Sequence, residues 1–82
     1  MREIKVIGFC DRKKIFYRLY RPLISHELWQ IEINNEFVGS ITKMDNEWSS
    51  RLNANSWLGE YEILIFIELI ENNNPVVSLR VA

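Results

Sequence analysis

Hydrophobic and polar residues alternate along residues 29–41, and this pattern predicts a β-hairpin. A period of two marks a strand with one buried face. The positions on that face are Trp29, Ile31 and Ile33, followed by Phe37, Gly39 and Ile41. Asn34 and Asn35 separate the two halves, and asparagine tolerates the positive φ angles that a tight turn requires.

The register of this hairpin follows from matching apolar side chains across it. A three-residue loop is expected, because it pairs Ile33 with Phe37. The same loop gives the other matched pairs, Ile31 with Gly39 and Trp29 with Ile41. A two-residue loop would instead set Ile33 opposite the charged Glu36.

The same alternation predicts two strands before the hairpin. One face of the second strand carries Ile15, Tyr17 and Leu19. Pro22 ends that strand, because proline donates no hydrogen bond to a ladder. Short connections cannot make parallel crossovers, so consecutive strands form an antiparallel meander. We expect four such strands, near residues 3–10, 14–21, 28–34 and 37–43.

The segment after the hairpin is polar. Residues 43–56 are rich in Asp, Asn, Ser and Glu, and we expect a loop that is long for a structureless connection. Trp48 is the large apolar side chain in this segment, and we expect it to be anchored against the core.

Residues 57–71 are compatible with a helix or a strand. Their length suits a helix, which Asn55 or Ser56 could cap. The alternation from Tyr61 to Leu69 and the frequent β-branched residues favour a strand. We predict the helix, because one face of a four-stranded meander must be covered.

These elements predict an α+β fold in a single domain of residues 1–82, with one C-terminal helix packed on a four-stranded antiparallel meander. Residues 76–81 alternate again, as a short final strand or as an arm that pairs with a neighbouring molecule. The predicted core consists of Ile15, Tyr17, Leu19, Trp29, Ile31, Ile33, Phe37, Ile41, Ile63, Phe66 and Ile70.

Composition adds expectations about association and location. Hydrophobic residues make up 48% of the 82 residues, more than one small core easily hides, so we expect a homodimer at micromolar concentration. The single cysteine, Cys10, forms no internal disulfide and is expected to be a small strand hydrophobe. With neither the long apolar core of a signal peptide nor a run that could cross a bilayer, a cytoplasmic protein without membrane contact is expected.

Residue types that carry catalysis or bind metals are scarce. One cysteine and one histidine make no metal-ligand cluster. The adjacent residues Ser25, His26 and Glu27 project in different directions and cannot form a catalytic triad. The three glycines are isolated, unlike those of a phosphate-binding loop. We therefore expect no enzyme activity, no cofactor and no metal.

Charge is distributed unevenly along the chain. Residues 1–21 have a net charge of +5 and residues 22–82 a net charge of −6. One face of the second strand combines cations with aromatic rings, and it has further cations near its ends. This candidate binding face comprises Lys14, Phe16, Arg18 and Tyr20, with Arg12, Lys13 and Arg21. Cations neutralise phosphates and aromatic rings stack on unpaired bases.

Two functions are compatible with these features. The favoured one is a small non-catalytic interaction module that self-associates through the apolar helix or the C-terminal segment. Its basic face would dock on an acidic protein surface, such as Glu60, Glu68 and Glu71 of the same or another copy. The alternative is single-stranded nucleic-acid binding on the basic N-terminal hairpin. Balanced charge favours the first, because nucleic-acid binders more often carry surplus positive charge.

Overall fold

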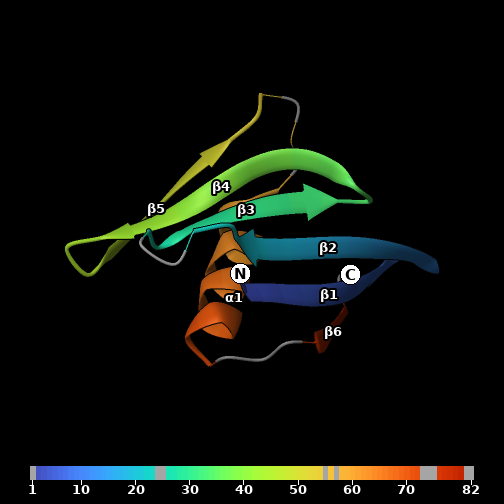
Figure 1. Ribbon diagram of the computed structural model, residues 1–82. Helices are drawn as coiled ribbons and strands as arrows, with labels where there is room; N and C mark the ends of the chain where they lie inside the picture. The colour runs from blue at the N-terminus through green and yellow to red at the C-terminus, as the bar shows by residue number, and fades with distance from the viewer. Residues whose placement is uncertain (1, 24–25, 55, 57, 73–75, 81–82) are drawn as a thin grey trace.

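The computed structural model describes residues 2–23, 26–54, 56, 58–72 and 76–80. Its elements, in chain order, are β1 (Arg2–Cys10), β2 (Lys13–Arg21), β3 (Leu28–Ile33), β4 (Glu36–Met44), β5 (Glu47–Leu52), α1 (Glu60–Glu71) and β6 (Val76–Arg80). The strands form a six-stranded sheet in the order β5-β4-β3-β2-β1-β6, and α1 lies against one face of this sheet (Figure 1).

Strands β1 to β5 form an antiparallel meander. This confirms an α+β fold in which a meander precedes a C-terminal helix, but the predicted number of four meander strands is wrong. The additional strand is β5, which lies where a loop of residues 43–56 was expected. Asp45 and Asn46 both have positive φ and form a two-residue turn that pairs Met44 with Glu47.

The last strand pairs within the chain. β6 is parallel to β1, with Lys5 opposite Val76 and Phe9 opposite Arg80. Of the two alternatives for residues 76–81, the short final strand is therefore the one that forms, at Val76–Arg80.

The central hairpin turns on two residues rather than three. Asn34 and Asn35 both have positive φ, and Ile33 lies opposite Glu36. The predicted pairing of Ile33 with Phe37 is therefore wrong. Two consecutive residues with positive φ give a turn whose twist matches that of the flanking strands, which outweighs the apolar match that a longer loop would provide.

A one-residue bulge in β4 then restores the predicted register. Ile31 pairs with Gly39 while its neighbour Glu32 pairs with Phe37, which leaves Val38 as the extra residue. Beyond the bulge, Trp29 lies opposite Ile41 as predicted. The bulge thus keeps Ile41 on the same buried face as Trp29, Ile31 and Ile33 despite the short turn.

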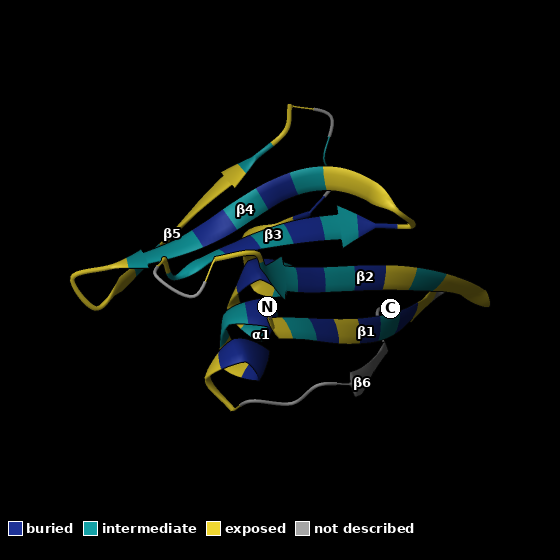
Figure 2. Ribbon diagram, in the orientation of Figure 1, coloured by how far each residue is buried: buried dark blue, intermediate teal, exposed yellow. Residues whose placement is uncertain are grey.

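The core lies between α1 and this inner face of the sheet, and Figure 2 shows buried positions alternating with more exposed ones along β1 to β4. The buried hydrophobic residues are Ile4, Val6, Tyr17, Leu19, Trp29, Ile31, Ile33, Ile41, Leu58, Ile63, Phe66, Leu69 and Ile70. The rings of Tyr17 and Phe66 are 5.5 Å apart and join the sheet to the helix.

Two predicted core residues lie elsewhere. Phe37 is 50% exposed, because the two-residue turn places it opposite Glu32 on the outer face. Ile15 is only partly buried, because it lies near the start of β2, before the residues of β2 that pair with β3. Ile4 and Val6 of β1 were omitted from the predicted core, although they alternate with polar residues as core positions do.

The helix is confirmed but begins at Glu60, three residues later than predicted. Gly59 is its N-cap, and the Glu62 carboxylate accepts a hydrogen bond from the Gly59 N–H at 3.1 Å. Glycine has no side chain to complete a capping box, so only this half is present. Trp48 packs against the core as expected, partly buried, and at the other end of the helix its Nε1 also donates to Glu71 Oε1 at 2.8 Å.

We predict that Gly39 tolerates no side chain. Its φ is +158°, and a Cβ there would lie 2.5 Å from the Arg51 carbonyl oxygen of β5. Gly39→Ala is expected to lower the free energy of unfolding by about 1–3 kcal/mol in urea titrations, because backbone must shift to make room. Ser40→Ala, one residue along, is the control and should leave stability nearly unchanged. An equal stability for both variants would contradict close packing of β4 on β5.

Candidate interaction surface on the open face of the sheet

The outer face of the sheet is not covered by α1 or by any other described helix. Strand alternation places on it the residues that lie between core positions of β1, β2 and β3. We call this surface the open face, and its central residues are Glu3, Lys5, Ile7, Phe9, Lys14, Phe16, Arg18, Tyr20, Gln30 and Glu32.

Arg18 occupies the centre of the open face and is compensated by two carboxylates. Its Nε donates a short hydrogen bond to Glu3 of β1, and its Nη1 lies 3.1 Å from Glu32 Oε1 of β3. The guanidinium carbon also lies 4.1 Å from the ring centre of Tyr20. The positive charge predicted to contact a ligand is therefore largely satisfied within the sheet.

These contacts shift the titration of both partners. The hydrogen bond from Arg18, opposed by partial burial, holds the pKa of Glu3 below its usual range. The hydrogen bond to Glu3, with a further one to Glu32, raises the pKa of Arg18. Both groups are thus held in their charged forms in the folded protein.

A second part of the open face is apolar and cationic. Ile7 of β1 pairs with Phe16 of β2, and Phe9 pairs with Lys14. Phe16 is 54% exposed. Lys5 is also exposed, with its Nζ 3.7 Å from Glu3. We call Lys5, Ile7, Phe9, Lys14 and Phe16 the β1–β2 patch.

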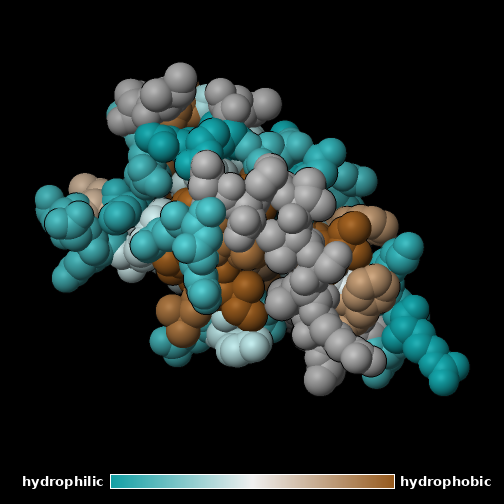
Figure 3. Space-filling view, turned by 90° about the horizontal axis from the view of Figure 1, so that it is seen from below, coloured by the Kyte–Doolittle hydropathy of each residue, from teal (hydrophilic) through white to brown (hydrophobic). Residues whose placement is uncertain are grey.

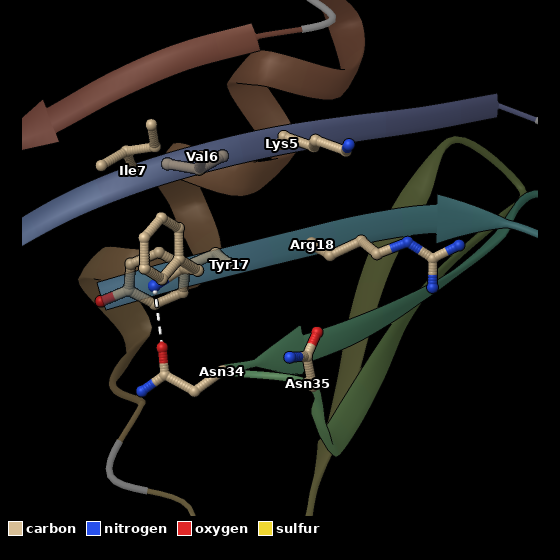
Figure 4. Close-up of a pocket in the computed structure, with 8 residues that line it drawn as sticks. Lys5, Val6, Ile7, Tyr17, Arg18, Asn34 and Asn35 are labelled. Atoms are coloured by element: carbon tan, nitrogen blue, oxygen red, sulfur yellow. Dashed lines mark hydrogen bonds between the residues drawn. The ribbon is translucent and has the colours of Figure 1, made fainter. Parts of the chain in front are cut away.

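The β1–β2 patch borders a depression of about 560 Å³. Figure 4 shows the side chains around it, on β1, β2 and the turn between β3 and β4. Asn34 Oδ1 accepts a hydrogen bond from the backbone N–H of Phe16 at 3.0 Å, which fixes this turn beside the patch. The lining is mainly apolar near Ile7 and Phe16 and cationic near Lys5, so it suits an apolar group that carries negative charge nearby.

The structure brings together only part of the predicted binding face. Lys14, Phe16, Arg18 and Tyr20 share the open face as expected. Lys13 and Arg21 alternate to the other side of β2, and Arg12 lies in the two-residue turn between β1 and β2. Arg21 instead holds the connection after β2, through hydrogen bonds to two backbone carbonyls and an ion pair with Glu27.

The glutamates of α1 do not neutralise the basic strand face within one molecule. The helix packs on the inner face, so Glu60 and Glu68 lie on the opposite side of the sheet from Arg18. Glu3 and Glu32 provide the compensation that was expected from the helix. Their role depends on cross-strand register, because the two-residue turn at Asp11 and Arg12 places Glu3 opposite Tyr20, beside Arg18.

The described residues contain no group of three or more Cys, His, Asp or Glu side chains arranged to hold a metal ion. Across the same residues, no helix combines the length and apolar character needed to span a membrane. Compared with known proteins, the chain matches no protein-family model, and neither a curated protein nor a solved structure is similar to it.

We predict that the Glu3–Arg18 pair makes stability depend on pH. The pKa of Glu3 is lower in the folded than in the unfolded chain, so the pair stabilises the fold at neutral pH and this contribution is lost as pH falls through the folded-state pKa. Glu3→Gln should lower the free energy of unfolding by about 0.2–1 kcal/mol at neutral pH. In acid, urea titrations should give equal stabilities for variant and wild type.

The matched control is Glu36→Gln, at the exposed first position of β4. It should show little effect at either pH. A deficit of the Glu3→Gln variant that stays the same in acid would indicate that packing, rather than charge, stabilises this position.

Proposed function

We propose that this chain is a small non-catalytic interaction module that self-associates through the outer surface of α1. The observation that most supports this proposal is that two large apolar side chains of this helix are exposed to solvent. Tyr61 is 73% exposed and Leu64 is 59% exposed. They lie three residues apart, which places them on neighbouring turns of one helix face.

The rest of this surface is acidic. Glu60 and Glu68 are exposed beside Tyr61 and Leu64, and these four residues define the outer surface of α1. Ile65 and Ile67 flank it and are half-buried. Figure 3, seen from below, shows hydrophobic side chains at the surface between hydrophilic ones. Covering such an apolar strip removes it from water, which favours association.

The alternative route through the C-terminal segment has less support. β6 already uses one of its edges to pair with β1 in the same chain, so residues 76–80 are not a free arm. We propose that the first product of association is a homodimer, which forms at micromolar concentration. We also propose that the protein is cytoplasmic.

Self-association should depend on Leu64. We expect light scattering and sedimentation to show a mass above about 10 kDa that falls on dilution through the micromolar range. Leu64→Ser removes one of the two exposed apolar side chains of this strip and should weaken association at least about tenfold, since burying such a side chain is worth roughly 1.5–3 kcal/mol. Met44→Ser, at the exposed end of β4, is the control. A monomer at every concentration would rule out the proposed function.

Nucleic-acid binding on the open face is expected to be absent. Arg18 already has two carboxylate partners, and Glu3 and Glu32 would repel phosphates beside it. A fluorescence titration with single-stranded oligonucleotides at low salt should show no saturable binding. Lys14→Glu is the better probe variant, because Arg18→Glu would place a third carboxylate between the other two. Saturable, salt-sensitive binding that Lys14→Glu abolishes would establish the alternative function.

A further inference from the structure

We infer that the outer surface of α1 docks on the β1–β2 patch of a second copy, so that the molecules associate head to tail. This inference rests on the proposed function and names the partner surface. The outer surface of α1 and the β1–β2 patch both expose apolar side chains, and the charges beside them have opposite signs.

Two copies of α1 are poor partners for each other. The helix contains four glutamates and no lysine or arginine. A symmetric contact between two outer surfaces would bring Glu60 and Glu68 close to the same residues of the other copy. Like charges across an interface are unfavourable, and more so as water is excluded. Apolar contact between Leu64 side chains would have to overcome this repulsion.

The β1–β2 patch has the complementary composition. Ile7 and Phe16 supply apolar surface, the exposed Lys14 supplies positive charge, and Lys5 adds positive charge that is paired with Glu3 at 3.7 Å. Arg12 in the adjoining turn is also exposed, beside Asp11. The patch can therefore contact both the apolar and the acidic side chains of the outer surface of α1.

The dimensions of the two surfaces agree. An α-helix is about 10 Å wide with its side chains, and adjacent strands are about 4.8 Å apart. One helix can therefore lie over β1 and β2 together. The paired segments of these strands are nine residues long, which is sufficient to accommodate the twelve-residue α1 lying along them.

The contact is heterologous, because its two halves are different surfaces. The outer surface of α1 faces away from the sheet, whereas the β1–β2 patch lies on the sheet face that α1 leaves open. Two copies that make one such contact retain one unused surface each. Association thus proceeds beyond the dimer as concentration rises, to a ring or an open chain of molecules.

Complementary variants test this arrangement. Phe16→Ser damages the patch and leaves the helix intact, while Leu64→Ser damages the helix and leaves the patch intact. Both residues are more than half exposed, and circular dichroism melting checks that each variant folds. Each variant alone should associate at least about tenfold more weakly than wild type. An equimolar mixture should form a 1:1 heterodimer that grows no further, measured by sedimentation velocity.

Salt gives an independent readout on the wild-type protein. Attraction between Lys14 and Glu68 side chains is screened by salt, so head-to-tail association should weaken as sodium chloride is raised. Symmetric pairing of α1 should instead strengthen, because salt screens repulsion between glutamates. Lys14→Glu provides a second patch variant if Phe16→Ser fails to fold, and it should also weaken association.

Each possible result either supports or overturns the head-to-tail contact. Restored pairing in the mixture supports the head-to-tail contact. A Phe16→Ser variant that associates like wild type, while Leu64→Ser is monomeric, overturns this inference but leaves the proposed function standing. Wild-type protein that remains monomeric, or that associates equally well with both substitutions, overturns the proposed function and the inference with it.

Discussion

The packing of the inner face depends on the single extra residue in β4. A two-residue turn alone would carry Ile41 to the outer face and leave Trp29 opposite a polar side chain. Val38 is the extra residue that shifts the register of β4 by one, so the apolar positions that follow it return to the side covered by α1. The pairing of β5 and the contact of Trp48 with the end of the helix both follow from that register.

The two parts of the open face differ in the side chains that they expose to water. Its centre carries charges that neutralise one another across three strands, with Arg18 between two glutamates. Its β1–β2 end carries aromatic and aliphatic side chains flanked by lysines. The first arrangement satisfies its polar groups internally, whereas the second leaves apolar area in contact with solvent. Exposed apolar area therefore identifies the β1–β2 patch as a candidate site more clearly than the number of cations does.

The periodicity of apolar residues was sufficient to predict most of the fold but not its edges. Alternation located β1 to β4, and the need to cover the meander decided correctly for a helix at residues 60–71. β5 was missed because an edge strand has few buried positions, here only the half-buried Trp48 and Leu52. The partners of Arg18 were missed because they lie on other strands, where turn length decides which side chains meet.

The parallel pairing of β6 with β1 also bears on how the chain folds. Every antiparallel pair in the meander joins neighbouring strands, so each can close over a short loop. The β1–β6 pair brings Lys5 beside Val76 across most of the chain, so its loop-closure entropy favours late formation. Until that late step, the outer edge of β1 presents unpaired N–H and C=O groups and is open to a strand from another chain. The order of assembly therefore makes β1 the vulnerable strand during folding, although it is an interior strand of the finished sheet.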